Sequence, residues 1–419
     1  MPLKDRAPLR WPGNVLGVSA TSTLGTLAQI LRNLPNVRLN SGMITSPTRR
    51  VAIVNSAQTV LSSSWSDRQH IDLITEVVSR TLKGTGVRID DVDFVIDSGS
   101  DFLDGRSISN CGFLGSMGAH HKEESRVEED GLWALGYAAN KVASGAAAIG
   151  LVIAYSKPSE GNVDDYWTSL LEPFIQRPVG LDQYTAAGLT AQMYLAAAGL
   201  CADDLRVVSE RAWGNAVGNP WVGVDAVPDD DAFWNETIAT PLRRSDLARP
   251  VDGAVAMLVC SAEVADQVPQ RSVWITGMGS AIDQHFLAAR EPTSLPACEA
   301  AARVAYEMSG GTSAREYDLI EVSGRSTVGE LMVLEALGFA EEHRGIDLYR
   351  SESDLSINPS GGALPADPIM ATGLVRLHEA VARISGRTCY EGTARNALVH
   401  GTGGFGMQNH NVVTIEADS

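Results

Sequence analysis

Two glycine-rich loops in the last third of the chain carry the residues with the clearest potential for chemistry. The first reads NPSGGALPADPIMATG from Asn358 to Gly373, and the second reads HGTGGFG from His400 to Gly406. Glycine has no Cβ, so it tolerates positive φ and lets the backbone come close to a ligand. Each loop adjoins an expected regular element, which predicts backbone amides facing a substrate. A pair of ordinary tight turns is the alternative.

Composition and charge exclude several classes of function. With 44% hydrophobic and 20% charged residues, the chain is typical of a soluble globular protein. Its net charge of −18 argues against nucleic-acid binding, although a few local cations could still hold an anionic cofactor. The five cysteines lack CxxC spacing, which favours a reducing compartment, and the eight histidines lack ligand spacing, so no metal site is predicted.

Nothing in the sequence indicates a membrane or an export route. No apolar run reaches the ~18 residues that a membrane helix needs. The N-terminus lacks the charged, apolar and small-residue order of a signal peptide. We therefore expect a cytoplasmic protein without a membrane span.

The elements that must position the two loops recur in the same order in two parts of the chain. Strands are expected at 51–54, 92–96, 149–154 and 254–259, then at 273–275, 318–322, 396–399 and 412–416. Helices are expected at 67–82, 132–144 and 186–198, then at 295–308 and 374–384. This β-α-β-α-β-β order, repeated twice, predicts α/β halves with mostly parallel sheets that pack face to face around a shared site.

These patterns divide the chain into three expected parts. Residues 1–48 form an N-terminal extension, residues 49–265 the first half and residues 270–419 the second half. An irregular stretch at about 157–250, rich in Trp, Pro and Asp, is inserted in the first half.

With this duplication, the chain resembles the thiolase superfamily, in particular the branch of the sterol carrier protein X thiolase domain and bacterial lipid-transfer proteins. The resemblance rests on NPSGG, on the last glycine loop, on DGAVA at 252–256 and on LEALG at 334–338. It implies a layered α-β-α-β-α core, with the 157–250 insertion as a loop domain that covers a groove for coenzyme A. No covalently bound cofactor is implied, and the coenzyme A thioester is the substrate.

The resemblance also implies four catalytic positions, and all four are altered here. Glu128 stands where the family places its nucleophilic cysteine at a helix N-terminus, although an acidic helix cap is the alternative. Ser323 stands at the family's oxyanion Asn or His. Asp367 replaces the His before Pro, and His400 replaces the cysteine that opens the last loop.

Further residues are expected to contact the substrate. Backbone amides of the two loops could hold an oxyanion: Gly361 and Gly362 in the first, Gly403 and Gly404 in the second. Three side chains are expected to bind the substrate: Tyr184, Arg243 and Arg325.

Three functions remain open at this point. The first is cleavage or formation of a C–C bond in an acyl-CoA without covalent catalysis, of retro-aldol or Claisen type, in lipid or steroid side-chain metabolism. The second is a non-catalytic thiolase-like subunit of a heteromeric complex. The third is a conventional acetyl-CoA acyltransferase. The resemblance implies as partners an acyl-CoA, a second thiolase-like chain in a homodimer or heteromer, and an OB-fold, zinc-ribbon protein.

Overall fold

The computed structural model describes residues 49–418, with gaps at 312–313, 315–316, 352–354 and 388–393. The expected N-terminal extension, residues 1–48, lies outside the described residues. Residues Arg49–Ser419 form one compact unit. Within the described residues, no helix is both long enough and apolar enough to cross a membrane.

Ten strands form one mixed sheet, and two more form a small separate sheet. The large sheet contains β1 (Val51–Gln58), β2 (Phe94–Ser98), β3 (Glu123–Val127), β4 (Ile149–Ser156), β7 (Gly253–Ser261), β8 (Val273–Ile282), β9 (Leu319–Glu321), β10 (Ser356–Ile357), β11 (Asn396–Gly403) and β12 (Asn409–Ala417). The small sheet contains β5 (Thr237–Ala239) and β6 (Leu242–Arg243).

Twelve α-helices lie between β1 and β12 along the described part of the chain. They are α2 (His70–Leu82), α3 (Leu114–Met117), α4 (Gly131–Ala143), α5 (Val163–Ser169), α6 (Gln183–Ala198), α7 (Arg206–Val217), α8 (Asp231–Asn235), α9 (Ala262–Ala265), α10 (Pro296–Ser309), α11 (Thr327–Ala336), α12 (Asp347–Arg350) and α13 (Thr372–Ile384).

The strand order reveals the duplication directly. The large sheet runs β10-β9-β11-β12-β8 and continues as β1-β7-β4-β2-β3. Number the five strands of each half along the chain and read each half from its outer edge of the sheet toward the middle. Both halves then have the order 3-2-4-5-1. The first strands of the two halves, β1 and β8, pair antiparallel and join the two parts.

The expectation of mostly parallel sheets was wrong. In each half two neighbouring pairs are parallel, such as β2 with β3 and β4. The other two are antiparallel, as where β11 turns directly into β12. No helical crossover separates those last two strands, and two strands joined by a short turn must run in opposite directions.

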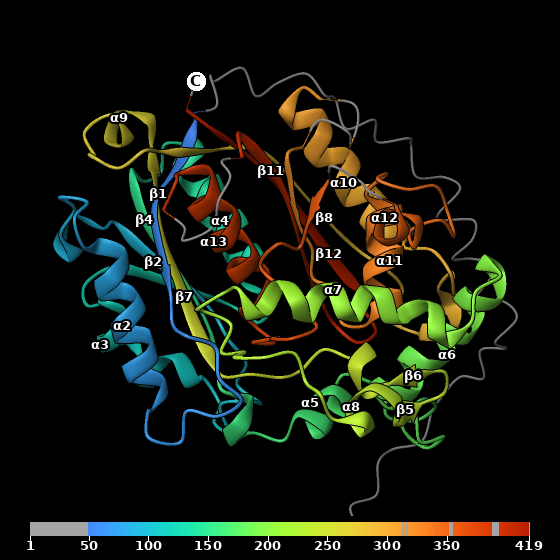
Figure 1. Cartoon of the computed structure of the whole chain (residues 1–419). Helices are drawn as coiled ribbons and strands as arrows, with labels where there is room; N and C mark the ends of the chain where they lie inside the picture. The colour runs from blue at the N-terminus through green and yellow to red at the C-terminus, as the bar shows by residue number, and fades with distance from the viewer. Residues whose placement is uncertain (1–48, 312–313, 315–316, 352–354, 388–393, 419) are drawn as a thin grey trace, which may run out of the picture. The chain divides into compact units, whose positions relative to one another are not determined.

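The helices form the layers of a thiolase-like α/β fold. Figure 1 shows α4 and α13 between the two arms of the sheet, with α2 outside one arm and α10 and α11 outside the other. The predicted apolar face of α4 is buried, as shown by Leu132, Leu135, Ala139 and Val142. Burial of this face accounts for its small and aliphatic residues.

Some local predictions failed for identifiable reasons. In α2 the predicted face includes Ile71, but that residue is 40% exposed, and Leu73 completes the buried face instead. The edge strand β3 was not predicted, because its sequence EESRV is polar and only partly buried. Edge strands often carry charge in this way, which hides them from apolar periodicity.

Candidate functional site

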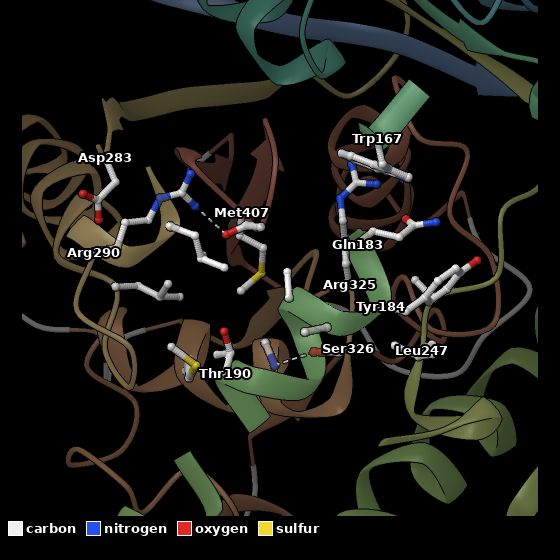
Figure 2. A pocket seen from close by; sticks show the side chains of 18 of the residues that line it. Trp167, Gln183, Tyr184, Thr190, Leu247, Asp283, Arg290, Arg325, Ser326 and Met407 are labelled. Carbon is white, nitrogen blue, oxygen red and sulfur yellow. Dashed lines mark hydrogen bonds between the residues drawn. The ribbon is translucent and has the colours of Figure 1, made fainter. Parts of the chain in front are cut away.

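A cavity of about 130 Å³ opens between the insertion and the second half. Its walls come from α5 and α6 of the insertion, from residues before α10, from the start of α11, and from both glycine loops (Figure 2). The lining includes Trp167, Tyr184, Arg290, Arg325, Asp367 and Met407. Pockets that combine apolar walls with a few convergent polar groups are typical of ligand sites.

An ion pair between Arg325 and Asp367 forms the polar wall of this cavity. Arg325 Nη1 donates to Asp367 Oδ2 at 2.8 Å. The hydroxyl of Thr372, the first residue of α13, donates to the other carboxylate oxygen. The two side chains are only 16% and 5% exposed, so the pair is largely shielded from water. Sequence reasoning named both residues, and the fold brings them together from segments about forty residues apart.

Arg325 retains hydrogen-bonding capacity in this position. Its guanidinium lies 4.6 Å from the ring centroid of Trp167, and Figure 2 shows the two groups side by side. One Nη2 bond goes to the carbonyl of Ile369 at 3.2 Å. Its buried Nε has no hydrogen-bond partner among the described residues. A shielded N–H of a cation is a strong donor for a developing oxyanion.

Asp130, not Glu128, caps the N-terminus of α4. Asp130 Oδ1 accepts from the amide of Leu132, and Oδ2 accepts from the amide of Gly373 in the other half. Burial raises the pKa of this carboxyl to about 7. Glu128 is exposed and accepts instead from the amide of Asp101 and from Arg126 Nε. Glu128 therefore does not line the cavity.

Glu129 is the acidic residue that faces the second glycine loop, and sequence reasoning missed it by one position. Asn409 donates to its Oε1. A Cβ built on Gly403 would collide with its Oε2. Burial raises the pKa of the Glu129 carboxyl. A side chain at position 403 would therefore require the Glu129 carboxylate to move.

His400 lies inside the sheet and not on the cavity wall. It is fully buried on β11, where its Nδ1 accepts from the amide of Ser323 at 3.4 Å. Its Nε2 lies 3.0 Å from Nδ1 of His410. Burial lowers the pKa of His400 well below its ordinary value. The structure therefore does not bring Glu128, Asp367 and His400 around one cavity.

The four glycines predicted to hold an oxyanion all lie outside the cavity wall. Gly361 has φ +106° and packs against Ala216, while Gly362 has φ +69° and packs against Asn358. Gly404 has φ +66° at the β11–β12 turn, beside Gln408. These three glycines shape tight backbone turns, and none of them lines the cavity.

Of the side chains predicted to bind the substrate, Tyr184 and Arg325 line the cavity and Arg243 does not. Tyr184 lines the cavity, and burial raises the pKa of its hydroxyl. Arg243 lies away from the cavity and pairs with Asp203, while its amide donates to Asp246. Arg243 therefore stabilises the insertion itself.

The described cysteines do not reach the cavity. Cys111 and Cys201 are exposed, while Cys260 and Cys298 are buried elsewhere in the fold. Cys389 lies outside the described residues. A nucleophilic thiol for covalent catalysis is therefore not placed at this site by the part of the chain that the structure describes.

Known proteins with the same features are thiolase-like. Residues 279–416 match the family model described as thiolase C-terminal domain-like. An acetyl-CoA acetyltransferase of Methanothermobacter thermautotrophicus is 28% identical over 378 residues, covering 85% of this chain and 97% of that protein. The 17-hydroxy-3-oxo-4-pregnene-20-carboxyl-CoA lyase of Mycobacterium tuberculosis is 27% identical, covering 75% of this chain and 86% of that protein.

Solved structures agree with the sequence matches. A structure described as an Ltp2-ChsH2(DUF35) aldolase superposes with a TM-score of 0.75 at 22% identity, covering 89% of this chain and 99% of that chain. The chain therefore has the thiolase-like fold, and sequence and structure together support the thiolase superfamily.

Proposed function

We propose that this protein acts on an acyl-CoA thioester and makes or breaks a C–C bond without a cysteine nucleophile. The observation that carries the proposal is the Arg325–Asp367 pair on the cavity wall of a thiolase-like fold, with no described cysteine beside it. The related pregnene-carboxyl-CoA lyase and the superposed aldolase support a retro-aldol reaction, since both are named for lyase or aldolase activity.

In this reaction Asp367 accepts the proton of a β-hydroxyl group. The Cα–Cβ bond then breaks, and its electron pair moves toward the thioester to form an enolate, while the β-carbon leaves as a ketone or aldehyde. Arg325, which lines the cavity, stabilises the enolate oxygen through its guanidinium group. The proton taken up by Asp367 then returns to Cα of the enolate, which gives the shortened acyl-CoA and restores the carboxylate. Because Thr372 and Arg325 hold both carboxylate oxygens of Asp367, the base is oriented before substrate enters.

We also propose that the insertion, residues 157–250, forms the loop domain that covers the acyl-CoA groove. This groove lies between the halves 49–265 and 270–419. Trp167 and Tyr184, both from this insertion, lie on the cavity wall and support that role.

The direct test is turnover of a β-hydroxyacyl-CoA by the full chain, alone and with an OB-fold, zinc-ribbon protein from the same source. We expect a ketone or aldehyde and a shortened acyl-CoA. Asp367→Asn should lower the rate by about 10²- to 10⁴-fold, the range for loss of a general base. Arg243→Met is the matched control, because Arg243 does not line the cavity. No product with either preparation would contradict the proposal.

A non-catalytic subunit is the second candidate, and the burial of His400 favours it. The imidazole that sequence reasoning predicted as acid or base cannot touch a substrate in this cavity. In that case the chain would be inactive but would co-purify with an active thiolase-like partner, and Asp367→Asn would leave the rate of the complex unchanged.

A covalent acetyl-CoA acyltransferase remains a separate alternative. Trapping with a radiolabelled acyl-CoA distinguishes it, since only that mechanism leaves a covalent acyl adduct on the chain.

A further inference from the structure

Three side chains with metal-binding atoms meet in the core of the second half, outside the cavity. They are Cys298, His400 and His410, and their ligand atoms all lie within 4.8 Å of one another. Each is at most 1% exposed. This cluster is not part of the family-derived site predicted from sequence, which included His400 alone.

The fold explains how these residues meet. In the β11–β12 hairpin His400 lies opposite Val412, and His410 lies opposite Thr402. Two residues further along a strand the same face returns, so both imidazoles lie on one face of the hairpin. Cys298 comes from the first turn of α10, which packs against this face.

One ring nitrogen of each imidazole faces the other ring. Their rings are 5.3 Å apart at 31°, with His400 Nε2 and His410 Nδ1 3.0 Å from each other. A hydrogen bond with the backbone of Met407 also holds the His410 ring. Neutral imidazole is the form that binds metal ions.

We propose that Cys298, His400 and His410 bind one divalent transition-metal ion of the zinc type. One thiolate and two imidazoles are a ligand set that suits zinc and its chemical substitutes. The ion occupies the space between His400 Nε2 and His410 Nδ1. On binding, the thiol of Cys298 loses its proton to solvent, and the ring proton of His400 moves to Nδ1.

Binding of the ion has a small cost at the backbone amide of Ser323. This amide, 3.4 Å from His400 Nδ1, must give up that contact once Nδ1 carries a proton. This is a long hydrogen bond, so the loss is small.

The position of the cluster gives such an ion a structural consequence. Met407, whose backbone holds His410, lines the cavity, and so does Leu295, next to the start of α10. An ion here would connect α10 to the β11–β12 hairpin directly behind the cavity wall.

Cobalt(II) titration of the full-length, tag-free and metal-stripped protein tests the proposal without any activity assay. We expect one equivalent to bind with a thiolate-to-cobalt absorption band and the visible bands of tetrahedral cobalt. Cys298→Ser should abolish the thiolate band. His410→Gln should weaken cobalt binding by at least about tenfold, because one of three ligands is lost. Cys260→Ser is the matched control: this buried thiol lies in β7, far from the cluster, and its loss should leave the spectrum unchanged.

Because a core substitution could disturb folding, the proposal is also tested on wild-type protein by thermal unfolding. Zinc should raise the midpoint of thermal unfolding of the stripped protein, and a chelator should reverse the rise. Neither a thiolate band nor a zinc-dependent rise in wild type would overturn the proposal. A thiolate band that persists in Cys298→Ser would overturn it equally.

Discussion

Among the arginine–carboxylate pairs of the second half, Arg376–Glu321 and Arg325–Asp367 differ in burial. Arg376 and Glu321 are both completely buried, with Nη1 and Oε2 3.4 Å apart. Arg325 and Asp367 are closer, at 2.8 Å, but they line a cavity. Both pairs connect an element of the second half to the loop between Asn358 and Gly373 or to the helix after it.

The surroundings of the two pairs explain their different uses. Arg376 also donates to Ser360, which in turn donates to Glu321, and Glu379 lies in the same network. The Arg376–Glu321 pair itself is completely buried, so we expect its effect to be on folding and on loop position. Arg325 and Asp367 line the cavity, so this pair is placed where a ligand could reach it. We therefore expect the first pair to act on folding and the second on turnover.

The largest expected effect is on stability, from Arg376→Met. Removal of one partner from a buried ion pair leaves Glu321 uncompensated, which costs about 3–5 kcal/mol. Denaturant unfolding measures the loss. The double variant Arg376→Met with Glu321→Gln should recover part of it, because no unpaired charge then remains. A single variant as stable as wild type would show that the network contributes little to folding.

Arg325→Met should have the opposite profile. We expect turnover of the β-hydroxyacyl-CoA to fall by about 10²-fold, as for loss of one oxyanion donor. The free energy of unfolding should fall by less than in Arg376→Met, because Thr372 still donates to Asp367 and the pair borders a cavity. If Arg325→Met retained full turnover yet unfolded as easily as the Arg376 variant, the distinction between the two pairs would fail.

A smaller effect is expected where Glu129 meets the second glycine loop. Gly403→Ala should cost about 1–3 kcal/mol, as in overpacked cores, because the new Cβ collides with the Glu129 carboxylate. Gly403 does not have positive φ, so the backbone itself tolerates alanine. The pair Gly403→Ala with Glu129→Ala should be less destabilised than the sum of the two single variants. Strict additivity would locate the strain elsewhere.

The smallest effect concerns pH. Burial, and then the neighbouring Glu321, raise the pKa of Glu379 in the buried network to about 6. The folded state therefore binds this proton more tightly than the unfolded state, and the associated stability is lost as pH rises from about 4.5 to about 6. Glu379→Gln should flatten this part of the stability curve, while the Arg325 variant should keep it. Denaturant midpoints at pH 4.5 and pH 7 measure the difference, and an equal slope in wild type and Glu379→Gln would contradict it.

The sequence predicted the thiolase-like fold well because its signals are local and repeated. Apolar runs such as 51–54 and 149–154 became strands β1 and β4, and the face of α4 was confirmed residue by residue. The polar edge strand β3 and the antiparallel pairing within each half were not predicted, since both depend on which strands become neighbours.

The site was harder to predict, because family alignment fixes a position in the chain and not the direction of a side chain. An error of one residue separates Glu128, which pairs with Arg126, from Glu129, which faces Gly403. His400 occupies the expected loop, yet its place on β11 points the imidazole into the core.

By itself the sequence determined the repeated α/β pattern and the two glycine loops, because these follow from residue type and spacing. The family resemblance implied Asp367 as a catalytic position, and Arg325 was predicted as a substrate-binding residue. Only the tertiary structure decided that Arg325 and Asp367 meet on a cavity wall. It also decided that His400 lies beside His410 and Cys298. His410 is ten residues away across the hairpin, and Cys298 is about a hundred residues away on a helix. Such meetings depend on strand register and helix packing, which bring together side chains that no local pattern connects.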